Sequence, residues 1–204
     1  MIKTLIFDFG DVFINLDKPA IERELLKLGV SKITDEMHHY ASQYEKGLIS
    51  TENLMNFFCN QFPNITESDF EYAWNAVILD FPEHRLEFIE TLSKEEKYNL
   101  ILLSNTNALH IEKVIETMGL SRYNRFKNSF NQFYLSHEIH LSKPNTNIYE
   151  FVLKKNNLIA NECLFIDDTY KNTETAARLG IHTWNNNSKN EDIVNLFTIN
   201  KHLF

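Results

Sequence analysis

Four short polar segments, each placed after an apolar run, carry side chains that together could perform chemistry on a phosphoryl group. Asp8 ends the first run, Ser104 ends the second, Lys143 follows a third, and the pair Asp167 and Asp168 ends a fourth. A carboxylate can act as a nucleophile, a hydroxyl and a lysine can bind phosphoryl oxygens, and paired carboxylates can hold a divalent cation. Each segment alone is ordinary, because an Asp after a strand often only caps a turn. Their joint occurrence in this order indicates a phosphoryl-transfer site.

These segments meet only if the apolar runs before them are neighbouring strands of one sheet. The first, second and fourth runs are nearly continuous, which is typical of strands covered on both faces. The apolar spacing from Ile111 to Met118 predicts a helix that ends at Gly119. Alternation of strands and helices predicts a parallel sheet with right-handed crossovers, whose sites lie at the carboxyl ends of the strands. The five predicted strands are at residues 3–8, 100–104, 132–135, 163–166 and 181–184.

The stretch from residue 17 to residue 81 has helical periodicity and no strand pattern. Thr34 and Thr66 stand where helix N-caps belong, and Gly29 and Gly47 stand where helices end. We therefore expect a helical cap, residues 17–81, inserted into a three-layer Rossmann-like α/β core made of residues 1–16 and 82–204.

The composition and charge of the chain indicate which kinds of molecule it is suited to bind. The chain has 204 residues and a formal net charge of −8, with no basic run, which disfavours nucleic acid and anionic membranes as partners. No apolar stretch approaches the ~20 residues that span a bilayer. Cys59 and Cys163 have no metal or redox spacing, so we expect buried thiols and a cytoplasmic protein. The predicted partner is a small molecule, and the choice between monomer and homodimer stays open.

The four polar segments resemble, in order and spacing, the motifs of the haloacid dehalogenase superfamily, and the resemblance covers essentially the whole chain. The run from Asp167 to Gly180 looks like the family's fourth motif. The segment from Tyr44 to Ser50 resembles the helical caps of a branch that includes bacterial α-glucose-1-phosphate phosphatases. The resemblance implies a magnesium-dependent phosphatase acting on a small phosphorylated metabolite, such as a sugar phosphate.

The same resemblance implies a role for each site residue. Asp8 would attack phosphorus and form an aspartyl-phosphate. Ser104 and the backbone amide of Asn105 would bind phosphoryl oxygens, and Lys143 would offset the negative charge. The implied Mg²⁺ ligands are Asp8, Gly10, Asp167 and Asp168.

One position departs from the family pattern. Phosphatases of this superfamily usually carry a second Asp two residues after the nucleophile, where it protonates the leaving oxygen, and this chain has Gly10 there. The glucose-1-phosphate phosphatase branch also has Gly here. Asp11 is either a substitute acid or a loop-capping carboxylate, and Glu45 either faces the substrate or is an exposed carboxylate at a helix end.

Three other functions stay open. A haloacid dehalogenase uses the same Asp nucleophile on carbon, but that chemistry needs no metal, so the pair Asp167 and Asp168 argues against it. A phosphotransferase or mutase is compatible with Gly10, because weak water activation favours another acceptor. A non-catalytic phosphate or metabolite binder would retain the same segments without turnover.

Overall fold

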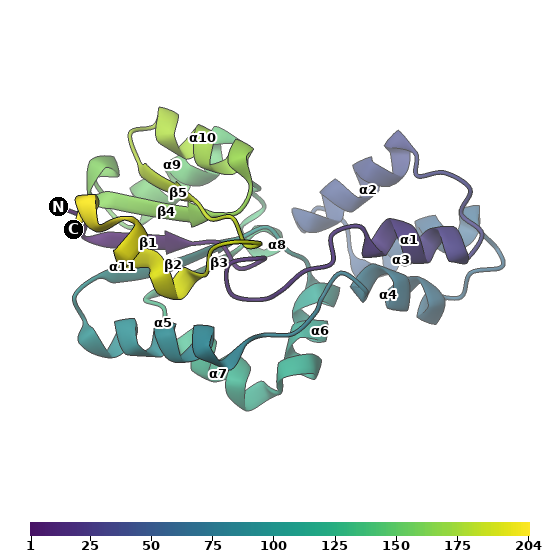
Figure 1. Ribbon diagram of the computed structural model, residues 1–204. Helices are drawn as coiled ribbons and strands as arrows, with labels where there is room; N and C mark the ends of the chain where they lie inside the picture. Colours follow the sequence, from purple (N-terminus) through teal and green to yellow (C-terminus); the bar gives the residue numbers. More distant parts are fainter.

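Residues 1–204 are all described by the computed structural model, in which five parallel strands form one sheet in the order β3-β2-β1-β4-β5. The five predicted runs are these five strands, so the predicted α/β class with a Rossmann-like parallel sheet is confirmed (Figure 1). The strands are β1 (Thr4–Phe7), β2 (Asn99–Ser104), β3 (Gln132–Leu135), β4 (Cys163–Asp167) and β5 (His182–Asn185).

Helices cover both faces of the sheet because successive strand side chains point to opposite sides. Leu5 and Phe7 of β1 pack in one hydrophobic cluster with α5 and α7, whereas Ile6 packs in another with α9 and α10. The core helices are α5 (Glu83–Glu95), α6 (Ala108–Met118), α7 (Leu120–Asn128), α8 (Ser136–Ile139), α9 (Thr146–Lys155), α10 (Tyr170–Arg178) and α11 (Leu196–Ile199), with 3-10 turns η1 (Ala160–Glu162), η2 (Ile193–Asn195) and η3 (Lys201–Leu203).

Four further helices form a separate group beyond the carboxyl ends of the strands, which we call the helical cap (Figure 1). Its helices surround their own hydrophobic cluster, in which Phe58 and Phe70 stack 4.5 Å apart. Thr34 and Thr66 accept hydrogen bonds from backbone amides of the first turns of α2 and α4, as their N-cap positions predict. The cap helices are α1 (Ala20–Lys27), α2 (Asp35–Glu45), α3 (Thr51–Gln61) and α4 (Glu67–Asn75).

The two linkers between the core and the cap run antiparallel beside each other. The amide of Asp17 donates to the carbonyl of Val77 at 2.9 Å, and the amide of Leu79 donates to that of Asn15 at 3.1 Å. Because both ends of the insertion leave the core through this one pair, the cap is held over the edge of the sheet where β1 ends.

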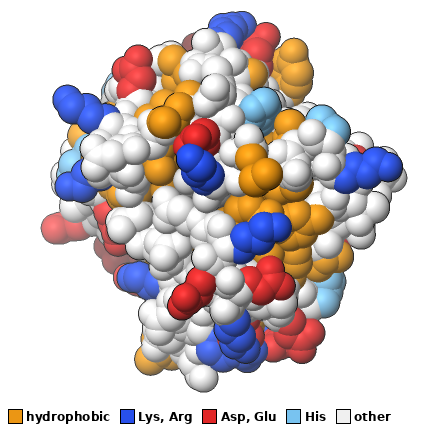
Figure 2. Space-filling view, turned by 90° about the vertical axis from the view of Figure 1, so that its left-hand side faces the viewer, with side chains coloured by type: hydrophobic (Ala, Val, Ile, Leu, Met, Phe, Trp, Pro, Cys, Tyr) orange, Lys and Arg blue, Asp and Glu red, His pale blue; other side chains and the backbone are white.

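The protein surface carries charged side chains of both signs, as the composition predicts (Figure 2). The face that carries the chain termini shows positive and negative side chains interspersed around a hydrophobic area (Figure 2). No helix has both the length and the apolar character needed to cross a bilayer.

Phe126 lies at the centre of an aromatic cluster beside the sheet, fully buried and 5.0–5.1 Å, between ring centroids, from Phe9, Phe13, Phe81 and Phe130. We expect Phe126→Ala to lower the free energy of unfolding by about 3–5 kcal/mol, since the lost ring leaves a cavity that its neighbours cannot fill. Urea denaturation measures this.

The control is Tyr72→Ala, because the Tyr72 side chain is 70% exposed and its loss should change stability by no more than about 0.5 kcal/mol. A Phe126→Ala loss as small as that of the control would contradict the assigned core.

Candidate active site

The carboxyl ends of three adjacent strands bring together the predicted site residues. Asp8 directly follows β1, Ser104 ends β2, and Asp167 ends β4. The Asp8 amide donates to the carbonyl of Ile166 at 2.8 Å, which extends the pairing of β1 with β4 by one residue. Because β1 lies between β2 and β4, the Asp8 carboxylate stands in the middle of this edge.

Lys143 is the cation of this edge and its side chain is 1% exposed. Its Nζ lies 2.7 Å from Asp8 Oδ1 and 2.7 Å from Asp167 Oδ2. Burial lowers the pKa of Lys143, but the two carboxylates outweigh it, so the net pKa is raised and the amine stays charged. Burial raises the pKa of Asp8 to about 7 although Lys143 opposes the rise, and Asp167 adds to it.

Asp167 is fully buried and its carboxylate is held from all sides. Oδ1 accepts hydrogen bonds from the Thr169 amide at 2.8 Å and from Asn172 Nδ2 at 3.0 Å. Oδ2 accepts from Lys143 Nζ at 2.7 Å and from the same Asn172 amide group at 3.0 Å. With this many protein donors, Asp167 fixes the position of Lys143.

Three carboxylates are arranged to hold a cation. Asp8, Asp167 and Asp168 each offer an oxygen within 4.8 Å of those of the other two. An all-oxygen set beside a phosphoryl site fits Mg²⁺ better than a softer metal. The backbone of Gly10, predicted to add a carbonyl ligand, lies in the same loop after β1.

Lys18, in the first linker to the cap, also belongs to the site, although the sequence did not predict it. Its Nζ contacts Asp168 Oδ2 and lies 3.0 Å from Asp11 Oδ2. Burial raises the pKa of the Asp168 carboxyl, and the Lys18 amine opposes that rise. No local pattern reveals this pair, because 150 residues separate Lys18 from Asp168.

Asn105 connects the segment of Ser104 with that of Lys143 through its side chain, in addition to the role predicted for its backbone amide. Its Oδ1 accepts from the Lys143 amide at 2.9 Å, and its Nδ2 donates to the Lys143 carbonyl at 2.9 Å. Nδ2 also donates to Glu45 Oε1 of the cap at 3.0 Å. The neighbouring Ser104 is buried, and its Oγ lies 3.4 Å from the Asn105 carbonyl.

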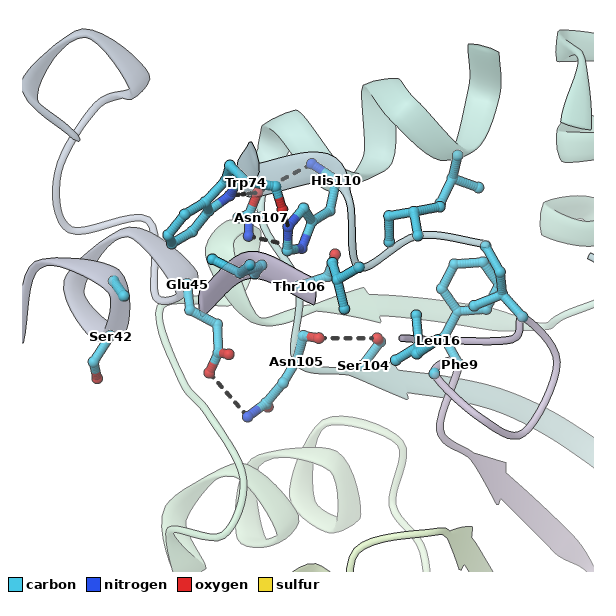
Figure 3. Close-up of a pocket in the computed structure, with 17 residues that line it drawn as sticks. Phe9, Leu16, Ser42, Glu45, Trp74, Ser104, Asn105, Thr106, Asn107 and His110 are labelled. Atoms are coloured by element: carbon cyan, nitrogen blue, oxygen red, sulfur yellow. Dashed lines mark hydrogen bonds between the residues drawn. The ribbon is translucent and has the colours of Figure 1, made fainter. Parts of the chain in front are cut away.

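A cavity of about 400 Å³ opens between the core and the cap beside these residues (Figure 3). Gly10, Ser104 and Asn105 line it from the core, and Glu45 and Trp74 line it from the cap. A volume of this order suits a small metabolite.

The loop after β1 carries no acid at position 10, and the Leu16 side chain packs against Gly10. A Cβ placed on Gly10 would lie 2.7 Å from Cδ1 of Leu16, so the Leu16 side chain fills that space. Asp11 adopts φ +54°, accepts a hydrogen bond from the Leu16 amide at 3.1 Å and pairs with Lys18. Asp11 does not line the cavity, so its observed role is the loop-capping alternative.

We expect Lys143→Met to lower the free energy of unfolding by about 3 kcal/mol at about pH 8, because two buried carboxylates lose their shared cation. Burial already raises the pKa of Asp8 in the folded protein, and a carboxyl with a raised folded-state pKa is destabilising once the pH exceeds its unfolded value. The loss should therefore shrink as the pH falls to about 5. Urea denaturation in chelator at both pH values measures it.

Lys27→Met removes an exposed lysine and is the control, with little expected change at either pH. A Lys143→Met loss that is small and independent of pH would show that the amine does not hold the two carboxylates.

Known proteins are similar to this chain over most of its length. D-ribitol-5-phosphate phosphatase of Bacteroides thetaiotaomicron is 26% identical over 192 residues, which are 90% of this chain and 91% of that protein. A HAD family enzyme of the same species, solved as an aspartate-to-alanine variant in complex with magnesium and inorganic phosphate, has a TM-score of 0.85 at 30% identity and covers 97% of this chain and 99% of its own. A HAD-like family hydrolase from Porphyromonas gingivalis has a TM-score of 0.76 at 28% identity over 90% of each chain.

The order of segments found in the sequence, the edge of the sheet where they meet and these relatives all point to one family. The match to that family extends over residues 2–180, most of the chain. The protein belongs to the haloacid dehalogenase-like hydrolases.

Proposed function

We propose that the protein is a magnesium-dependent phosphatase that hydrolyses a small phosphorylated polyol or sugar through an aspartyl-phosphate. The observation that carries the proposal is the pair of 2.7 Å contacts from Lys143 Nζ to Asp8 and Asp167. The backbone of Lys143 is bonded to Asn105, which lines the cavity together with Ser104. The relative that acts on D-ribitol-5-phosphate supports the substrate class.

The metal assignment rests on the donor set. Asp8, Asp168 and the Gly10 carbonyl would hold Mg²⁺, and Asp167 would contact it through water, because Lys143, Thr169 and Asn172 already occupy its oxygens. When bound there, Mg²⁺ supplies positive charge that stabilises the phosphoryl oxygens.

The chain's own residues perform the transfer. An oxygen of Asp8 attacks phosphorus as the bond to the leaving oxygen breaks. The Ser104 hydroxyl donates a hydrogen bond to a non-bridging oxygen, and Lys143 offsets the charge that develops there. Water then attacks the aspartyl-phosphate, which releases inorganic phosphate and restores the Asp8 carboxylate. The buried position of Asp8 keeps bulk water from the reacting atoms.

We expect Asp8→Asn to reduce turnover of a polyol phosphate by more than about 10³-fold, because an amide is a very poor nucleophile. Steady-state assays of phosphate release measure the loss. Rapid acid quench with radiolabelled substrate should trap labelled wild-type protein that hydroxylamine releases, and should leave the variant unlabelled.

Asp35→Asn, a change of an exposed cap carboxylate, is the matched control and should retain activity. Strong residual activity in a clean Asp8→Asn preparation, or label that survives hydroxylamine, would rule out the aspartyl-phosphate.

We expect Asp168→Asn to raise the Mg²⁺ concentration needed for half-maximal activity by at least about tenfold, with a smaller change in KM for substrate. Removal of an anionic ligand weakens a site for a hard cation, whereas the contacts of Ser104 and Lys143 with phosphate remain. Mg²⁺ titrations of activity and calorimetry of Mg²⁺ binding measure the two quantities.

The matched contrast is Lys18→Met, which should shift Mg²⁺ binding in the opposite direction. Lys18 pairs with Asp168 and is half-exposed, and such pairs contribute at most about 1 kcal/mol, so binding should tighten by up to about fivefold. If chelator did not change the activity of the parent protein, the metal assignment would be wrong and the dehalogenase alternative would be favoured.

A further inference from the structure

We infer that Glu45 of the cap is the group that protonates the leaving oxygen, in place of the acid that is absent at position 10. This inference rests on the proposed phosphatase function. It assigns a catalytic role to a residue outside the segments that bind the phosphoryl group.

The reaction needs such a group when the leaving oxygen belongs to an alcohol. A departing alkoxide is strongly basic, and a positioned acid contributes typically about 10²–10⁴-fold to the rate. Gly10 offers no side chain, Leu16 fills the space beside it, and the Asp11 carboxylate is engaged outside the cavity with Lys18. The loop after β1 therefore does not supply the proton.

Only two of the 17 residues that line the cavity have titratable side chains, Glu45 and His110. His110 is engaged at both ring nitrogens, since Nε2 donates to the Trp74 carbonyl at 3.0 Å and Nδ1 accepts from Asn107 Nδ2 at 3.0 Å. Burial lowers the pKa of His110 to about 4, so the ring is neutral. His110 therefore has no proton to give, which leaves Glu45.

The Glu45 carboxylate faces the phosphoryl-binding loop. Glu45 is the last residue of α2, is half-buried, and its side chain points to Asn105, beside Ser104, in the wall of the cavity (Figure 3). Its Oε1 accepts from Asn105 Nδ2 at 3.0 Å, and the same Asn105 side chain holds the backbone of Lys143. One short network therefore joins Glu45 to the residues that bind the phosphoryl group.

The backbone around Glu45 is fixed to the core. The Ser136 hydroxyl donates to the Glu45 carbonyl at 2.6 Å, and His140 Nδ1 lies 2.9 Å from the Lys46 carbonyl. Gly47 has φ +64°, and a Cβ there would lie 2.0 Å from the carbonyl oxygen of His137. Only glycine permits this close approach. Gly47 therefore allows the end of α2 to lie against α8, which keeps Glu45 in the cavity.

The surroundings of Glu45 favour its protonated form. Burial raises the pKa of the Glu45 carboxyl, and Lys143 and Lys46 oppose the rise. The short helix α8, which packs against this end of α2, adds the imidazoles of His137 and His140 to the titratable groups nearby. A phosphorylated substrate brings further negative charge into the cavity, which also favours a neutral carboxyl.

Glu45 loses one proton and regains one in each catalytic cycle. Asp8 forms its bond to phosphorus, the bond to the leaving oxygen breaks, and the proton of Glu45 goes to that oxygen, so a neutral alcohol departs. Glu45 is then a carboxylate and takes a proton from the water that attacks the aspartyl-phosphate. The products are inorganic phosphate, the Asp8 carboxylate and a protonated Glu45.

The test compares Glu45→Gln with the parent on two substrates, glycerol phosphate and dinitrophenyl phosphate. The first has a basic leaving oxygen that needs a proton, and the second has an acidic phenol that does not. We expect kcat/KM of the variant to fall by about 10²–10⁴-fold for glycerol phosphate and by less than about threefold for dinitrophenyl phosphate. Glutamine keeps the oxygen that accepts from Asn105, so the network stays intact.

Ser42→Ala is the matched control, because Ser42 lines the cavity from α2 one turn earlier and has no acid. It should affect both substrates equally. As a second variant, Glu45→Ala should regain activity on glycerol phosphate, but not on dinitrophenyl phosphate, when formate is added.

Equal losses on both substrates, or no loss on either, would overturn the assignment of Glu45 as the proton donor. Failure of the proposed function has a different signature. In that case Asp8→Asn stays active, or the parent hydrolyses neither substrate with Mg²⁺, and the inference falls with it.

Discussion

The site depends on one buried amine shared by two carboxylates. Lys143 Nζ lies 2.7 Å from both Asp8 and Asp167, and all three residues are buried. Two carboxylates at this depth would repel each other and take up a proton without a cation between them. With the amine in place, Asp8 can stay ionised as the proposed nucleophile requires, and the net negative charge that remains suits a divalent cation. The pairing of β1 with β4 brings the two carboxylates together.

The interactions that hold Lys143 extend outward in two directions. Thr169 and Asn172 hold Asp167 from the start of α10, and Asn105 brackets the backbone of Lys143 from the end of β2. These partners follow two different strands, β4 and β2, so the geometry of the charged group is set by the sheet rather than by any single loop. This explains why each polar segment is uninformative alone and why their order in the chain is informative.

The strands and the residues that follow them could be predicted from the sequence, because both leave local signals. A buried strand is a nearly continuous apolar run, as at residues 100–104, and a polar residue directly after it falls at the carboxyl edge. Thr34 and Thr66 likewise mark helix starts by residue type alone. In each case the physical cause and the sequence signal lie within a few residues of each other.

The contacts between the core and the cap could not be predicted in this way. Lys18 meets Asp168 and Glu45 meets Asn105 only because the paired linkers and the helix ends set the cap at one position over the sheet. The residues of the first pair are 150 positions apart in the sequence and those of the second pair are 60 apart, so no local sequence pattern connects them. The half-buried environment of Glu45 has the same origin, because nothing in the composition of α2 requires that its last carboxylate point inward.

The core and the cap contribute different parts of the site. In the proposed function the core supplies the groups that act on phosphorus, all of them at the edge of the sheet. The cavity proposed to receive the rest of the substrate is lined largely by the cap and by the loop at Gly10. Leu16 of the first linker occupies the space beside Gly10, and the carboxylate that lines the cavity, Glu45, comes from α2. Gly47, just after α2, allows the backbone to approach α8 closely enough to keep Glu45 inside the cavity. The loss of a side chain at position 10 and the fixed end of α2 are thus two parts of one arrangement, in which proton transfer is assigned to the cap and phosphoryl transfer to the core.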